Sequence, residues 1–218
     1  MRNYRFCIAL VLMASWSCAV GAEGQSTADL GTKGPWLFSF GLGGFSPASS
    51  EELKNQSGQY SVLVGGEYRY SKNLSFDVDL WAADQRIDTP SNVVAPFFGT
   101  VDGRATISTG AISFVAKLVW PMDRFEPYIG AGGGLFFSRL YISGSVFGMP
   151  ASHEETDTSL GGLLLGGVDI WVAQNWAIGA EFRHVSVKAN FGNVIPGDVN
   201  VGGNSVMATL HWRPAGYR

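Results

Sequence analysis

Residues 59–70 read QYSVLVGGEYRY and alternate between two kinds of side chain. One set is apolar, small or aromatic, whereas the other includes the charged Glu67 and Arg69. A period of two places the two sets on opposite faces of a β-strand. The same alternation runs through residues 74–83 and 205–213. The pattern therefore predicts an all-β chain whose strands each have one apolar and one polar face.

Eight segments of this kind can be placed along the chain, and their connections alternate in length. We expect strands at 36–45, 59–70, 74–85, 105–120, 126–142, 158–172, 176–189 and 204–213. Three connections are short, namely 71–73, 121–125 and 173–175, and four are long, namely 46–58, 86–104, 143–157 and 190–203. Short turns at one end and long loops at the other are typical of transmembrane barrels. We therefore expect an eight-stranded antiparallel up-and-down transmembrane β-barrel.

Two further features bear on this barrel. The glycine-rich stretch 130–134 leaves the phase of the fifth strand undecided, and such glycines relieve strain in a curved wall. Five tryptophans fall near the short-turn end of the predicted barrel, where an indole can lie half in lipid and half in water. They are Trp36, Trp120, Trp171, Trp176 and Trp212.

The first 22 residues have the organisation of a secretory signal peptide. Arg2 and Arg5 precede an apolar run, and small residues lead to a predicted cleavage site after Ala22. A lipoprotein anchored at Cys18 is the alternative, which the bulky Trp16 disfavours. We therefore expect a signal peptide at 1–22, a single barrel domain at 23–218, and an outer-membrane location.

Charged residues of the regular strands fall on the face opposite the apolar one. A basic side chain that faces lipid near the bilayer centre costs about 2–4 kcal/mol, so we expect these residues to face the lumen. Because acids and bases are nearly balanced, we expect an ion-paired network that fills the interior. Its predicted members are Glu67, Arg69, Asp77, Asp79, Lys117, Asp169, Glu181, Arg183 and Arg213.

Composition restricts the possible partners and cofactors. Removal of the two signal-peptide arginines takes the formal net charge from −3 to −5, and an acidic chain without a basic patch argues against nucleic-acid binding. The glycine-rich stretches lack the phosphate-loop pattern. The acidic segment 153–157 has a single histidine, so we interpret it as a solvated loop and expect no metal site and no cofactor.

The chain resembles the small outer-membrane β-barrels of the outer-membrane-protein A and X type. The resemblance rests on residues 66–70, on 125–134 and on the closing strand 199–212. It implies contact with outer-membrane lipids and lipopolysaccharide, and insertion by the barrel-assembly machinery. That machinery usually recognises a terminal strand aromatic, whereas this chain continues for several residues beyond Trp212. The resemblance leaves the extracellular ligand unidentified.

Function is expected to be non-enzymatic, a structural or surface-interaction role carried by the long loops. One alternative is an enzyme, because His184 and Ser186, with Asp198 later in the chain, are similar to the triad of outer-membrane lipid A deacylases. Those enzymes have an asparagine where this chain has Val187. A narrow small-solute channel is the other alternative, against which the bulky inward residues Trp81 and Trp171 argue.

Overall fold

The computed structural model describes residues 35–48, 59–88, 94–95, 99–100, 102–146, 149–192 and 198–214. The predicted signal peptide lies outside these residues. Within them, no helix has the length and apolar character needed to cross a bilayer.

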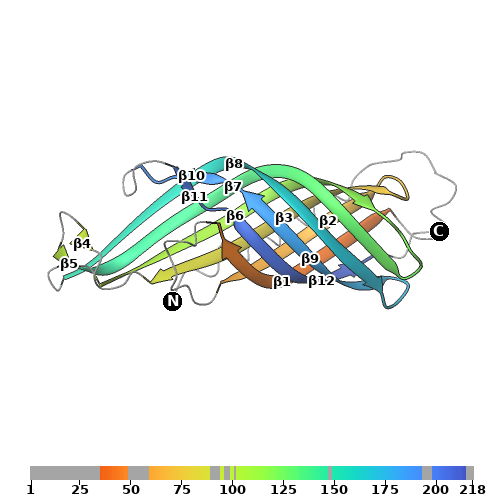
Figure 1. The fold of residues 1–218 in the computed structure, drawn as a ribbon, viewed down its shortest axis with the longest axis horizontal. Coiled ribbons are helices and arrows are strands. Elements are labelled where there is room, and N and C mark those ends of the chain that lie inside the picture. Colours follow the sequence, from red (N-terminus) through yellow and green to blue (C-terminus); the bar gives the residue numbers. More distant parts are fainter. Residues whose placement is uncertain are drawn as a thin grey trace.

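Eight long antiparallel strands close into a barrel (Figure 1). They are β1 (Trp36–Pro47), β2 (Tyr60–Arg69), β3 (Leu74–Asp88), β6 (Asp102–Val119), β7 (Phe125–Val146), β8 (Met149–Trp171), β9 (Trp176–Ser186) and β12 (Gly203–Trp212). Two short hairpins lie outside the barrel sheet, β4 (Val94–Ala95) with β5 (Gly99–Thr100) and β10 (Lys188–Asn190) with β11 (Asp198–Asn200). The order β1-β12-β9-β8-β7-β6-β3-β2 confirms the predicted up-and-down barrel.

One predicted loop is wrong. Residues 143–157 belong mostly to strands, because β7 continues to Val146, β8 begins at Met149, and these two residues form the last pair of the ladder. The segment is polar and was therefore interpreted as a loop, but antiparallel pairing of β7 with β8 forms backbone hydrogen bonds whatever the side chains are.

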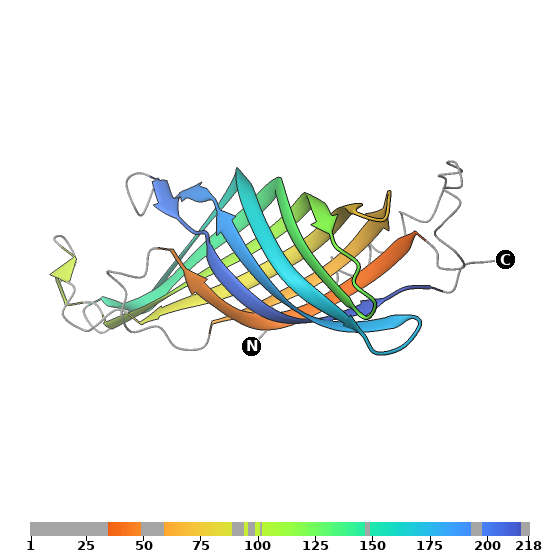
Figure 2. The ribbon, with the colours of Figure 1, turned by 45° about the vertical axis from the view of Figure 1, so that its right-hand side comes forward.

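At the end opposite the short turns, β3, β6, β7 and β8 project beyond the rest of the barrel (Figure 2). Pairing between β2 and β3 stops at Tyr60 and Asp84, and pairing between β8 and β9 stops at Gly162 and Ser186. The ladders of β3 with β6, β6 with β7 and β7 with β8 continue past these points. We call the projecting sheet the extension; it comprises residues 85–88, 102–107, 140–146 and 149–161.

The outer face of the barrel is apolar and ends in an aromatic girdle at the short turns. Trp36, Trp120, Trp176 and Trp212 are each 38–44% exposed there. Trp212 stacks on Phe38, with ring centroids 5.7 Å apart. Trp171 differs from the other four, because it is only 9% exposed and belongs to a buried cluster with Leu37 and Ala177.

The interior near the long connections is filled by apolar side chains. Phe45, Trp81, Phe136 and Leu140 belong to one buried cluster there. The chain between β9 and β12 contributes further side chains to this cluster. They are those of Val187, Ala189, Phe191 and Val201, which are all buried in it. We call residues 187–192 and 198–202 the cap, because they seal this end of the lumen with apolar groups.

The structure also fixes the phase of the fifth barrel strand, β7. Phe136 points inward and is fully buried, whereas Phe137 points outward and is 46% exposed. A Cβ atom on Gly132 would collide with the Phe114 carbonyl oxygen of β6, and one on Gly134 would collide with the Ile112 carbonyl oxygen. The glycines therefore permit a close approach of the β6 and β7 backbones that any side chain would prevent.

Candidate functional site: the polar network inside the barrel

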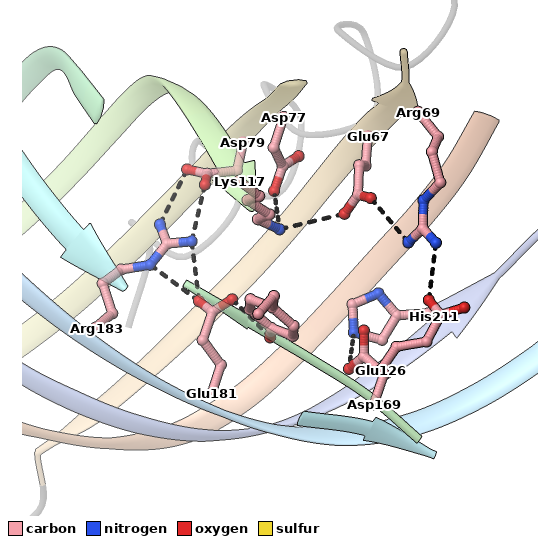
Figure 3. A network of polar contacts seen from close by, with 11 residues as sticks. Glu67, Arg69, Asp77, Asp79, Lys117, Glu126, Asp169, Glu181, Arg183 and His211 are labelled. Carbon is pink, nitrogen blue, oxygen red and sulfur yellow. Dashed lines mark hydrogen bonds and ion pairs between the residues drawn. The ribbon is translucent and has the colours of Figure 1, made fainter. Parts of the chain in front are cut away.

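All nine charged residues that the sequence placed in the lumen are buried on the inner face, each 8% exposed or less. They come from five strands and the residue that follows β12, and most of them face one another across the interior (Figure 3). Two further ionisable groups, Glu126 and His211, are buried among them. The network has three parts along the barrel.

The first part centres on Arg183 of β9. Its guanidinium donates two hydrogen bonds to Asp79 of β3, at 2.8 and 3.1 Å, and lies 3.0 Å from Glu181. Asp79 also accepts a hydrogen bond from the Ser113 hydroxyl, and Glu181 accepts one from the Tyr128 hydroxyl at 3.1 Å. Period two places Glu181 and Arg183 on one face of β9, and barrel closure brings β3 opposite to them.

The second part centres on Lys117 of β6. Its ammonium nitrogen lies 2.6 Å from Asp77 and 3.4 Å from Glu67. Glu67 in turn lies 3.3 Å from Arg69, which also contacts Glu126 at 2.9 Å. Acids and bases therefore alternate along a continuous chain of contacts, so no carboxylate in it is left without a cation.

The third part lies nearest the short turns. His211 Nε2 is 3.1 Å from Asp169 Oδ1 across the β12–β9–β8 wall. The Arg213 guanidinium lies over the Trp171 indole, 4.3 Å from the ring centroid. Through this cation–π contact, the Arg213 and Trp171 side chains together cover the lumen on its short-turn side.

The arrangement is that of a filled interior. Each of the six buried carboxylates in the network has a basic nitrogen within 3.4 Å. Asp77 and Asp79, which are spaced like a pair of catalytic acids, are instead held by two different cations. Because burying an unpaired charge is costly, this pairing is what allows so many ionised groups to occupy a narrow lumen.

The residues of the possible hydrolase triad are not brought together. His184 Nδ1 is hydrogen-bonded to Asn204 Oδ1 at 2.8 Å on the outer face, so the position behind the imidazole is occupied by an amide. Asp198 instead accepts a hydrogen bond from the Asn190 side chain at 3.4 Å. Ser186 is exposed on the same face as His184. Among the described residues, no group of three or more histidine, cysteine or acidic side chains is arranged to hold a metal ion.

Comparison with known families decides the identity of the fold. The family model of the outer membrane protein beta-barrel domain matches residues 8–211. The chain belongs to this family. It is accordingly an outer-membrane protein, and its apolar outer face is the lipid-facing one.

Solved structures of outer-membrane proteins are similar to this chain at low sequence identity. OprG from Pseudomonas aeruginosa is 13% identical, with 85% of this chain and 99% of that chain covered and a TM-score of 0.56. Neisserial surface protein A is 17% identical, with coverages of 82% and 96% and a TM-score of 0.45. Ail of Yersinia pestis, solved with a heparin analogue, is 11% identical, with the same coverages and a TM-score of 0.49. No curated protein sequence matches the chain.

Sequence reasoning missed several members of the network. Glu126, the only acid on the inner face of β7 in the ion-paired network, precedes the glycine-rich stretch whose phase was undecided. Tyr128 is only 4% exposed and donates a hydrogen bond to Glu181. Every second residue of β7 from Phe136 back to Glu126, Tyr128 included, lies on the same face of the strand. The sequence alone does not show that Phe136, and not Phe137, faces the lumen.

Proposed function

We propose that this outer-membrane barrel is a non-enzymatic surface-interaction protein that presents the extension outside the cell. The observation that carries the proposal is the extension itself, in which four paired strands continue beyond the closed wall. A barrel that only needed to span the bilayer would have no use for these extra pairs. A rigid sheet is also better suited than a loop to hold a recognition surface in one conformation.

The filled interior favours this role over that of a channel. The charged network occupies the half near the short turns, and the apolar cluster with the cap occupies the other half. We expect purified protein in a planar lipid bilayer to give no stable conductance steps. Reproducible single-channel steps from the wild-type protein would contradict the proposal and favour the narrow solute channel.

The geometry around Ser186 also disfavours the lipid A deacylase. Acyl transfer by a serine needs a base, a group that orients the base and donors for the oxyanion. His184 contacts Asn204, while Asp198 is engaged elsewhere. We expect lipid A from cells that overexpress the protein to keep all its acyl chains in mass spectra. Loss of one chain, abolished by Ser186→Ala, would support the enzyme instead.

Biogenesis and orientation complete the proposal. Transmembrane barrels have short periplasmic turns, so the end with the cap and the extension would face outward, among the sugars of lipopolysaccharide. The barrel-assembly machinery would insert the chain, using β12 and its final aromatic Trp212.

The direct test shortens the extension without opening the barrel. Ile142 and His153 are paired opposite each other, so residues 143–152 can be replaced by Asn-Gly, which favours a two-residue hairpin turn. Bacteria that display the wild type or the shortened hairpin are compared for adhesion to immobilised proteins and polysaccharides. We expect adhesion above barrel-free cells for the wild type only, at equal surface amounts. Equal adhesion by both proteins would contradict the proposal.

A further inference from the structure

The apolar surface that faces the lipid has different heights on different sides of the barrel. On β9 the outward side chains are apolar over residues 176–182, and the next one is His184. On β7 they are apolar or small over residues 125–137, and the next one is Arg139. Both stretches start at the short turns, so the apolar surface of β9 is about half as long as that of β7.

Neighbouring strands follow the same division. β12 pairs with β9, and its outward side chains are apolar over residues 206–212, with Asn204 next. β6 pairs with β7, and its outward side chains are apolar or small over residues 110–118, with Ser108 next. We call the outer surface of β9 and β12 the low side and that of β6 and β7 the high side.

Strand geometry converts these lengths into heights. A rise of about 3.3 Å per residue and a tilt of about 40° give about 2.5 Å per residue along the membrane normal. His184 therefore lies about 20 Å above the short-turn end, whereas the apolar side chains of β7 reach about 30 Å. The apolar band of an outer-membrane barrel is usually about 25 Å tall. The low side thus places polar groups at a depth where a bilayer of uniform thickness has hydrocarbon.

The polar groups of the low side form one cluster on the outer face. His184 Nδ1 and Asn204 Oδ1 are 2.8 Å apart, and Ser186 is exposed on the same face of β9. An imidazole has a second ring nitrogen and an amide has two N–H donors, so this contact does not use all the polar atoms of the pair. Lipid tails offer them no hydrogen bond, and burial in hydrocarbon would therefore be costly.

We propose that the bilayer is thinned beside β9 and β12, and that headgroups of outer-leaflet lipids descend there to contact His184, Ser186 and Asn204. Bilayers accommodate a short apolar surface by thinning. Headgroups and their water offer donors and acceptors to the imidazole, the hydroxyl and the amide. The inference goes beyond the proposed surface role and does not depend on it; only the choice of leaflet follows from the orientation given above.

The test measures depth at matched positions of the refolded barrel in vesicles of dioleoyl phosphatidylcholine. Residues 23–218 contain no cysteine, so single-cysteine variants can carry one nitroxide label. Phe182 of β9 and Ala131 of β7 both face outward, equally far along their strands from the short turns. We expect the label in F182C to collide several-fold more often with a water-soluble nickel chelate than the label in A131C.

A second pair of labels separates thinning from a tilt of the whole barrel. Ala180 and Ile129 are matched in the same way but lie nearer the short turns. A tilted barrel in a uniform bilayer would shift this pair as much as the first one. Equal nickel collisions for A180C and I129C, together with the difference at the upper pair, would support thinning. A similar difference at both pairs would overturn the proposal.

The polar cluster is tested by replacing it. H184L/N204L extends the apolar surface of the low side, so the label at residue 182 should lose most of its excess nickel collisions. The matched variant S108L/T158L adds two outward leucines beyond the apolar surface of β6 and β8 and should leave that excess unchanged. Equal collisions at residue 182 with and without H184L/N204L would overturn the assignment to these side chains.

Vesicles that also contain lipopolysaccharide separate two sources of headgroups. Excess nickel collisions at residue 182 in phospholipid alone would assign the contact to headgroups in general, and an excess only with lipopolysaccharide would assign it to that lipid. Equal collisions at residues 182 and 131 in both compositions would overturn the proposal. Dipolar broadening between labels at residue 182 of neighbouring barrels would overturn it as well, because a second copy would then cover the low side.

Discussion

At the scale of single residues, the interior depends on ion pairs that have no access to water. The Arg183 and Asp79 side chains are 1% and 0% exposed and share two hydrogen bonds. Such a pair adds little net stability compared with apolar groups of the same size, because both ions lose their hydration. Removing Asp79 is different, since the buried Arg183 guanidinium loses its two-hydrogen-bond partner and keeps only Glu181 as a counter-ion.

Asp79→Leu should therefore lower the free energy of unfolding by about 3–5 kcal/mol. The triple variant Asp79→Leu, Glu181→Gln and Arg183→Met should recover much of the loss, because it removes the guanidinium together with both carboxylates that it pairs with. The measurement is the urea midpoint of the refolded barrel, followed by its heat-modifiable migration on gels. Glu154→Gln is the control, because its exposed pair with Arg139 should contribute less than about 1 kcal/mol. Equal midpoints for Asp79→Leu and the control would contradict this account.

At the scale of elements, β7 shows how backbone geometry overrides side-chain pattern. Its inward glycines lie where the carbonyl groups of β6 approach closely, so the local curvature of the wall requires residues without a Cβ atom. The outward Gly66 of β2 is different, because a Cβ atom there would meet nothing within 4 Å. Glycines of the two kinds look alike in the sequence but have different roles.

Gly132→Ala should destabilise the barrel by about 1–3 kcal/mol, the usual cost of overpacking a rigid site. Gly66→Ala should change stability little, because the added methyl group faces the lipid side. Urea titration of both variants in the same detergent provides the comparison. If the two alanines have the same effect, the close approach of β6 and β7 does not constrain residue 132.

At the scale of the whole molecule, the two ends of the barrel differ in construction. One end has the short turns, the aromatic girdle and the charged network, whereas the other has the apolar cap and the extension. This polarity gives the barrel a defined orientation in an asymmetric membrane. The extension continues beyond Asp84, a partly exposed residue at which the pairing of β2 with β3 ends.

An epitope tag inserted between residues 147 and 148 should bind antibody on intact cells, because the flanking residues Val146 and Met149 form the last pair of the extension. The same tag inserted between 72 and 73 should bind antibody only after the outer membrane is permeabilised. Flow cytometry of intact and permeabilised cells gives the measurement. Staining of intact cells through the 72–73 tag would show that the barrel has the opposite orientation.

The sequence by itself determined the barrel, its strand number and the composition of its two faces. These follow from local rules: side chains alternate along any strand, and lipid cannot accommodate the charges of β2, β3 and β9, so these charges lie inside. Residues such as Asp79 and Arg183 could therefore be placed in the lumen from periodicity alone.

Only the tertiary structure decided which of those charges meet, where the strands end and what closes the lumen. Asp79 and Arg183 are 104 positions apart, so their contact depends on barrel closure and register, which no local pattern encodes. The extension was missed because its residues are polar, as loop residues usually are. Only the pairing of β6 with β7 and of β7 with β8 shows that they form strands. The cap was missed because its burial depends on strands that are distant in sequence, as the buried Phe191 shows.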